Sequence, residues 1–118
     1  MLVVKRTSFD AAHFLPKYEG KCKNMHGHRW TVELGVEGPV NPWTGMVVDF
    51  TELKYFLKVK VVEVFDHKVV NDVVENPTAE NIVAYIGEAW ENWLRKGYQE
   101  LALVRVWETE DSYAEWRP

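Results

Sequence analysis

The sequence HRWTVELGVE at residues 28–37 carries the clearest fold signal in the chain. Its apolar side chains alternate with polar residues or glycine, and they are Trp30, Val32, Leu34 and Val36. Successive side chains of a β-strand point to opposite faces, so alternation with a period of two is typical of a strand with one buried face. The pattern predicts a strand over residues 28–37 that turns its apolar face toward a core.

Further strands are predicted on both sides of this one. Residues 2–9 (LVVKRTSF) read as a strand that continues as far as His13, and residues 101–108 (LALVRVWE) read as another. A turn around Glu110-Asp111 would bring residues 112–116 back against this last strand as a hairpin.

The segment 51–64 is predicted to be a helix, because its apolar residues recur at spacings of three and four. A cluster of valines in the same segment works against this prediction, since β-branched side chains lose rotamer freedom in a helix. The apolar positions are Leu53, Phe56, Leu57, Val61 and Val64, and the valine cluster is Val59, Val61, Val62 and Val64.

A second helix is predicted over residues 79–96. Thr78 is suited to the N-cap, Glu80 lies in the first turn, and Lys96-Gly97 is typical of a helix C-terminus. One apolar stripe along this segment consists of Ile82, Ile86, Ala89, Trp90, Trp93 and Leu94.

The predicted order is two strands, two helices and two strands. Strands that are grouped apart from helices indicate an α+β fold with an antiparallel sheet. A chain of 118 residues without repeats or linker-like segments is expected to form a single domain over residues 1–118.

Composition excludes several classes of protein. Hydrophobic residues make up 47% and charged residues 27% of the chain, which excludes a disordered or fibrous protein. The formal net charge of −4 argues against a nucleic-acid partner and against a polybasic membrane anchor. No apolar stretch is long enough for a signal peptide or a membrane span. A single cysteine, Cys22, excludes an internal disulfide framework, and this usage fits a reducing, cytoplasmic location.

The chemistry-bearing residues are concentrated between residues 10 and 28. His26 and His28 stand two apart at the start of the central strand, so both imidazoles point to the same face as Trp30. Two ring nitrogens from one strand can reach one ion at the 2.0–2.1 Å distance that zinc requires. If the first strand pairs with the central one, His13 joins His26 and His28 as a third histidine ligand. Three histidines leave a fourth coordination position open, as in catalytic zinc sites.

Two other readings of these histidines stay open at this point. In one, His26 and His28 are hydrogen-bonded residues at a strand end and His13 is a loop residue, with no metal. In the other, the metal is structural and Cys22 is its fourth ligand.

Cys22 lies in a polar loop with three lysines, Lys17, Lys21 and Lys23. Positively charged surroundings favour the thiolate form of a cysteine at neutral pH. Cys22 is therefore a candidate nucleophile or base, and the alternative is a small buried thiol.

Asp66 and His67 form a second candidate pair after the first predicted helix. A carboxylate beside an imidazole can fix the tautomer of the ring and raise its basicity, which suits acid–base catalysis. An ordinary polar loop is the alternative.

Glu108 follows the apolar positions Val104 and Val106 on the same strand face, where a carboxylate needs a partner such as a pair of ligand N–H groups. Its alternative is an outward orientation at the strand end.

Six segments together resemble the family of 6-pyruvoyl- and 6-carboxy-tetrahydropterin synthases. They occur in the order of that family and span nearly the whole chain. The segments are Phe9-Asp10-Ala11-Ala12-His13, Cys22-x-x-x-His26-Gly27-His28, Thr44-Gly45-Met46-Val47-Val48-Asp49-Phe50, Asp66-His67, Pro77-Thr78-Ala79-Glu80-Asn81 and Glu108-Thr109.

The resemblance implies a role for each matching residue. His13, His26 and His28 match the zinc ligands of the family, and Cys22 matches its catalytic cysteine. Asp66 and His67 match the catalytic partner pair, Glu108 matches the glutamate that anchors the pterin ring, and Thr78 lies where the family contacts that ring. The resemblance also implies the T-fold, a four-stranded antiparallel sheet with two helices on one face. It further implies a homo-oligomer, a hexamer built as a dimer of trimers, with each active site between subunits.

Within the family, the three residues between Cys22 and His26 resemble the carboxy type of the queuosine pathway. That resemblance implies a lyase that converts 7,8-dihydroneopterin triphosphate to 6-carboxy-5,6,7,8-tetrahydropterin and releases acetaldehyde and triphosphate. The pyruvoyl type, which eliminates triphosphate, carries a longer spacer. A third branch cleaves dihydroneopterin and has a glutamate in this loop, whereas Lys23-Asn24-Met25 contains none. A non-catalytic, zinc-stabilised pterin-binding protein is the alternative from a different class.

Overall fold

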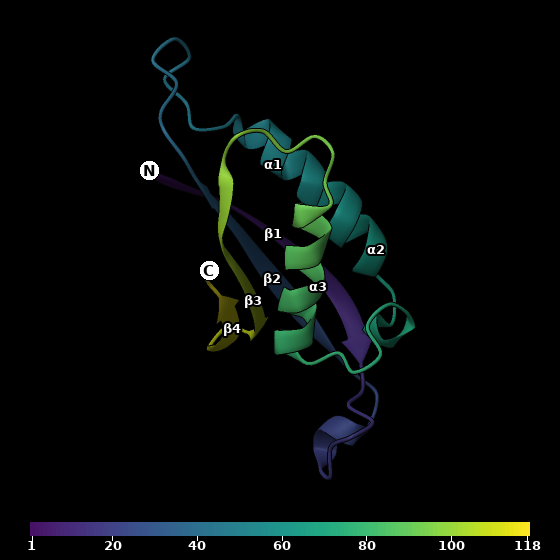
Figure 1. The fold of residues 1–118 in the computed structure, drawn as a ribbon. Coiled ribbons are helices and arrows are strands. Elements are labelled where there is room, and N and C mark those ends of the chain that lie inside the picture. The colour runs from purple at the N-terminus through teal and green to yellow at the C-terminus, as the bar shows by residue number, and fades with distance from the viewer.

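Four strands form one antiparallel sheet in the computed structural model, which describes residues 1–118. The strands lie in the sheet in chain order, as Figure 1 shows. The predicted strands are confirmed, and the central one begins at His26, two residues before the predicted start, so both His26 and His28 belong to it. The strands are β1 (Leu2–His13), β2 (His26–Glu37), β3 (Glu100–Thr109) and β4 (Ser112–Trp116).

Two helical segments cover one face of this sheet (Figure 1). The first consists of α1 (Phe50–Leu57), a π-helical stretch (Lys58–Val62) and α2 (Glu63–Phe65), and the second is α3 (Ala79–Glu91). The wider π-helical turns coincide with most of the valine cluster that works against a regular α-helix. Structural neighbours described below share this arrangement, so the predicted α+β T-fold is confirmed.

The predicted end of the second helix at Lys96-Gly97 is wrong, because α3 ends at Glu91. Asn92 leaves the helical conformation, and its backbone N–H and side-chain amide both donate to the Glu88 carbonyl. The side-chain amide thus satisfies a carbonyl of the last turn, which is one way in which the end of a helix is stabilised. Trp93 still packs against Phe56, with ring centroids 5.4 Å apart, whereas Leu94 is 98% exposed and does not belong to the apolar stripe.

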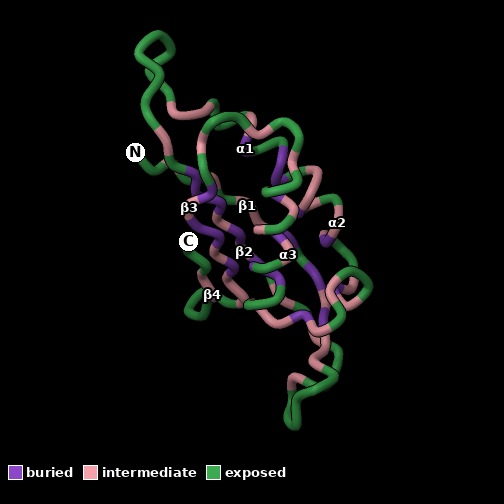
Figure 2. Tube along the Cα trace, viewed as in Figure 1, coloured by how far each residue is buried: buried purple, intermediate pink, exposed green.

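The core lies between the sheet and the helices. Phe9 on β1 stacks between Trp30 of β2 and Phe65 of α2, with centroid distances of 6.3 and 5.4 Å. Figure 2 shows buried residues along the middle of the molecule and exposed loops at its two ends. These loops, residues 14–25 and 38–49, contribute to an elongated shape of 53 × 24 × 23 Å. None of the helices has the length and apolarity needed to span a bilayer.

The end of α3 at Glu91 generates a stability prediction. Replacing the fully buried Ile86 by alanine should lower the free energy of unfolding by about 2–5 kcal/mol, through lost burial and the remaining cavity. Replacing the exposed Leu94 by alanine should change it by less than about 0.5 kcal/mol. Urea unfolding followed by circular dichroism measures both changes, and a loss at Leu94 similar to that at Ile86 would contradict the observed helix end.

Candidate functional site

Three histidine rings meet where β1 ends and β2 begins. The strand register pairs His13 with His26 and Ala11 with His28. Side chains at these positions point to the helix-covered side of the sheet, as Trp30 does. The ring centroid of His13 lies 4.6 Å from that of His26 and 5.1 Å from that of His28. The sheet thus brings the three predicted ligands together.

Backbone carbonyls fix the orientation of two of these rings. Nδ1 of His13 lies 2.8 Å from the Pro77 carbonyl, and Nδ1 of His26 lies 2.7 Å from the Asn24 carbonyl. A carbonyl oxygen only accepts, so both Nδ1 atoms carry the proton and both Nε2 atoms present lone pairs. These two Nε2 atoms are 3.1 Å apart. Two lone pairs at this distance repel each other unless a proton or a cation lies between them.

The third ring completes an arrangement that fits a metal ion. Nε2 of His28 is buried and has no hydrogen-bond partner. One ligand nitrogen from each of the three histidines lies within 4.8 Å of the others. Ligands about 2.0–2.1 Å from a tetrahedral zinc ion are roughly 3.3 Å apart, so small ring movements would suffice. Burial holds the pKa of His13 and of His28 below its ordinary value of 6.5, and this favours the neutral, metal-binding form of both rings.

Glu108 lies beside this cluster, at the end of β3. Its carboxylate oxygens are 3.9 Å from Nε2 of His13 and 3.9 Å from Nε2 of His28. These separations are too long for hydrogen bonds, but they place a negative charge next to the three rings. The partners of Glu108 on this strand face are therefore the imidazoles of its own chain, and its side chain remains 30% exposed.

Thr78 and Glu108 line the same open hollow of about 590 Å³. Thr78 is the N-cap of α3, as predicted, and its hydroxyl accepts a hydrogen bond from the Asn81 N–H at 3.1 Å. Pro77, whose carbonyl holds His13, directly precedes it. The helix start thus joins the histidine cluster to the hollow.

Asp66 and His67 form a close pair outside this cluster. Oδ2 of Asp66 lies 2.9 Å from Nδ1 of His67. Hydrogen bonds from the Asp10 N–H and from His67 hold the pKa of the Asp66 carboxyl below its ordinary value, so the carboxylate stays ionised and orients the ring. The His67 side chain is 79% exposed. His67 is also the one non-glycine residue with positive φ, 59°, a conformation that is costly unless the surroundings enforce it.

Cys22 stands apart from both groups. It lies half-buried in a short helical turn, Lys21–Lys23, and its carbonyl accepts a hydrogen bond from the Leu15 N–H at 2.8 Å. The group of potential metal ligands contains three histidines and no sulfur. The structure therefore does not place the sulfur of Cys22 among the ligands, as the structural-metal interpretation requires.

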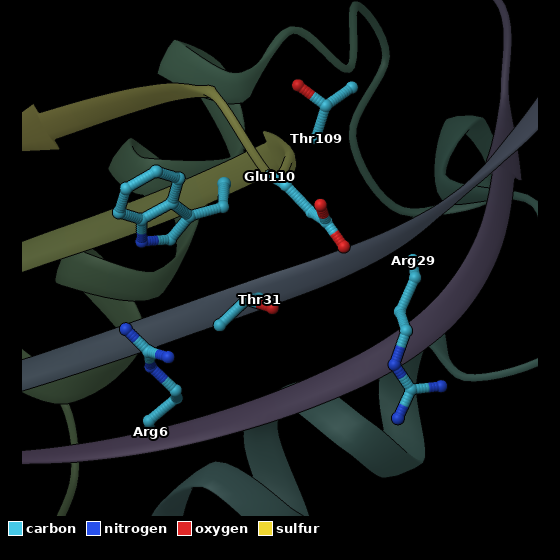
Figure 3. Close-up of a pocket in the computed structure, with 6 residues that line it drawn as sticks. Arg6, Arg29, Thr31, Thr109 and Glu110 are labelled. Carbon is cyan, nitrogen blue, oxygen red and sulfur yellow. The ribbon is translucent and has the colours of Figure 1, made fainter.

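A second hollow, of about 320 Å³, lies on the face of the sheet that the helices leave uncovered (Figure 3). Arg6 and Arg29 line it, together with Thr31, Thr109, Glu110 and Trp107. Both arginines are already paired, Arg6 with Glu33 and Arg29 with Asp10, at 3.3 and 3.2 Å. This hollow contains none of the predicted site residues.

Residues 2–118 match the model of a protein family described as 6-pyruvoyl tetrahydropterin synthase. The chain belongs to this family. A 6-carboxy-5,6,7,8-tetrahydropterin synthase of Synechocystis is 38% identical over 121 residues, which cover 98% of this chain and 92% of that protein. A dihydroneopterin monophosphate aldolase of Pyrococcus furiosus is 37% identical over 109 residues, which cover 90% of this chain and 88% of that protein.

A solved structure confirms the family fold. The 6-pyruvoyl tetrahydropterin synthase of Caenorhabditis elegans superposes with a TM-score of 0.88 and 27% identity, covering 100% of this chain and 95% of that one. Family members therefore share the sheet-and-helix scaffold while their names describe different reactions. The family consists of pterin-processing enzymes, and the reaction of this chain depends on its own residues.

Sequence reasoning missed the groups that orient the site. The carbonyls of Pro77 and Asn24 hold two of the rings, and no residue type signals a backbone acceptor. It also missed Asn71, which binds the backbone of Phe14 immediately after His13. An asparagine close behind Asp66-His67 was the one available signal.

The lowered pKa values of His13 and His28 predict a pH dependence for the metal-free protein. Unfolding restores the ordinary pKa of 6.5, so the unfolded chain binds more protons than the folded chain as the pH falls below that value. Stability should be constant above about pH 7.5 and should fall steadily from pH 6.5 downward. Urea unfolding in the presence of a chelator between pH 5 and 8 measures this slope. His28→Gln should flatten the slope, and an unchanged slope in that variant would refute this origin.

Proposed function

We propose that this chain is a zinc enzyme that converts 7,8-dihydroneopterin triphosphate to 6-carboxy-5,6,7,8-tetrahydropterin. One water would be consumed, and acetaldehyde and triphosphate would be released. The observation that carries this proposal is the convergence of three buried or half-buried histidine nitrogens beside Glu108, in a chain of a pterin-processing family. The product would belong to the queuosine pathway, in the cytoplasm.

His13, His26 and His28 would hold the zinc ion. Bound there, zinc would act as a Lewis acid on the hydroxyl groups of the substrate side chain. The hydrogen bonds from Nδ1 of His13 and His26 to carbonyls support this assignment, since second-shell acceptors of this kind fix the tautomer of metal-binding histidines.

Cys22, Asp66 and His67 would carry the proton transfers. The thiolate of Cys22 would accept a proton from a side-chain carbon of the substrate, and His67 would serve as the second acid–base group. Asp66 would stay ionised throughout and keep the proton of His67 on Nδ1. Nε2 of His67 would then face the substrate with its lone pair.

Glu108 and Thr78 would bind the pterin ring. The carboxylate of Glu108 can accept two parallel hydrogen bonds from the N–H groups of an aminopyrimidine edge. Its 30% exposure and its place in the hollow that contains Thr78 leave one side open to a ligand.

We propose further that the enzyme works as a homo-oligomer, a hexamer formed as a dimer of trimers. β1 and β4 are the two edges of the sheet, and the β4 edge and the part of the β1 edge before Asp10 are open to a neighbour. Trp43, at 95% exposure, lies in one of the two projecting loops, where a partner would cover it. His67 is exposed and Cys22 lies outside the histidine cluster. A neighbouring subunit would bring Asp66-His67 of one chain to Cys22 of another.

The loop before His26 favours the carboxy type over its rivals. Three residues separate Cys22 from His26, whereas the pyruvoyl type carries a longer spacer. These three residues, Lys23-Asn24-Met25, include no glutamate of the kind that the aldolase branch has there. The Pyrococcus furiosus relative keeps the aldolase as a second candidate. Product identity separates these reactions, because each breaks a different bond of the side chain.

Metal binding is the first test of this proposal. The purified chain should bind one zinc ion, and His28→Ala should weaken binding by at least about tenfold, since it removes a ligand and not merely an outer contact. Competition with a chromophoric chelator measures the affinity. His67→Ala is the matched control and should leave it unchanged. Equal affinity in the wild type and in His28→Ala would refute the three-histidine site.

Turnover is the second test. Incubation of the zinc-loaded protein with 7,8-dihydroneopterin triphosphate, followed by mass analysis, should yield acetaldehyde and the 6-carboxy product. Cys22→Ala should lower the rate by about 10²–10⁴-fold while the fold and the zinc content remain.

Each other outcome has a defined meaning. Triphosphate release without acetaldehyde would indicate the pyruvoyl type, and a 6-hydroxymethyl pterin would indicate the aldolase. Binding without any product would indicate a non-catalytic pterin-binding protein. Stoichiometric loss of zinc in Cys22→Ala would establish the structural metal site instead.

A further inference from the structure

The segment from Asp66 to Asn71 lies along the end of β1 and takes the place of a neighbouring strand. The N–H of Asp10 donates to Oδ1 of Asp66 at 3.0 Å, and the Asp10 carbonyl accepts from the His67 N–H at 2.7 Å. Two residues further, the Ala12 N–H donates to the Lys68 carbonyl at 3.1 Å. The segment thereby satisfies the outward-facing backbone groups of β1 at Asp10 and Ala12.

Asn71 continues this pairing with its side chain. Its Oδ1 accepts a hydrogen bond from the Phe14 N–H at 3.0 Å, and its Nδ2 donates to the Phe14 carbonyl at 2.9 Å. Both bonds are partly buried, so water competes with them only weakly. An asparagine side chain offers one acceptor and two donors in a plane, and it can therefore replace a strand partner for a single residue.

Phe14 joins two parts of the candidate site. It directly follows His13, whose ring belongs to the metal-binding cluster. It directly precedes Leu15, whose N–H donates to the Cys22 carbonyl at 2.8 Å. The loop beyond it is mostly exposed, so few other contacts fix the place where the loop leaves the sheet.

We propose that Asn71 is a positioning residue that clamps the backbone of Phe14 and thereby holds His13 and the base of the Cys22 loop in place at the end of β1. This inference rests on the proposed function for its kinetic consequences. The physical reason is covalent continuity, since the candidate metal ligand His13, the clamped residue Phe14 and Leu15 at the base of the Cys22 loop are consecutive residues. Losing the clamp frees the Phe14 peptide, and both neighbours gain freedom to move.

The experiment compares Asn71→Ala, Asn71→Asp and the control Asn92→Ala. Asn92 also uses its side-chain amide to bind a backbone carbonyl, that of Glu88, but it lies at the end of α3, outside the candidate site. Zinc affinity, the alkylation rate of Cys22 by iodoacetamide with and without zinc, and the kinetic constants are measured for each variant at a temperature where all are folded.

Asn71→Ala should weaken zinc binding by about tenfold, in the range known for second-shell residues. It should also speed alkylation of Cys22 several-fold and lower kcat by about 10–100-fold with little change in KM, because the substrate contacts remain. Asn71→Asp keeps the acceptor for the Phe14 N–H but sets a carboxylate oxygen against the Phe14 carbonyl, so it too should weaken zinc binding and speed alkylation of Cys22. Asn92→Ala should match the wild type in all three measurements.

The inference is overturned if Asn71→Ala resembles Asn92→Ala in zinc affinity and in alkylation rate. If Asn71→Ala does not fold, Asn71→Asp decides alone, and wild-type behaviour of that variant overturns the inference. A wild type without turnover on dihydroneopterin triphosphate would refute the proposed function, while zinc affinity and alkylation would still test the clamp.

Discussion

The antiparallel pairing of β1 with β2 is the constraint on which the rest of the structure depends. It runs without interruption from the pair Leu2–Glu37 to the pair His13–His26. Because side chains alternate between the faces of a strand, a slip of one residue would move His13 to the opposite face from His26. The same register buries Phe9 opposite Trp30. The burial of the core and the convergence of the histidines therefore require one and the same pairing.

The candidate site lies where this pairing runs past the hydrophobic core. Trp30 forms its wall on the core side, with its ring 4.8 Å from that of His13 and 5.4 Å from that of His28. An apolar wall disfavours protonated imidazole, and backbone carbonyls direct the remaining protons away from the centre. The result is a group of three nitrogens: Nε2 of His28 has no hydrogen-bond partner, and the Nε2 atoms of His13 and His26 face each other. A cation is the simplest species that satisfies them together.

The site is divided between well-packed and exposed parts. The histidines and Glu108 are set by strands, whereas Cys22 lies in a loop that projects from one end of the molecule (Figure 1). Asp66-His67 is attached to the open edge of β1, with the His67 ring exposed. Strands give the precision that the proposed metal coordination needs, and the exposed parts suit completion by the second chain of the proposed oligomer.

The sequence by itself determined the strands, the presence and order of both helices, and the three histidines, because alternation and helical spacing are local properties of the chain. It also supplied the six segments that resemble the family. The end of α3 was mispredicted, since the stripe of apolar residues continues to Leu94 while the capping geometry of Asn92 stops the helix at Glu91. Only the tertiary structure decided that Glu108 lies beside the histidines, that carbonyls orient their rings, and that Asn71 holds Phe14. These contacts join residues far apart in the chain, and they form only when the sheet and its edge segment are packed together.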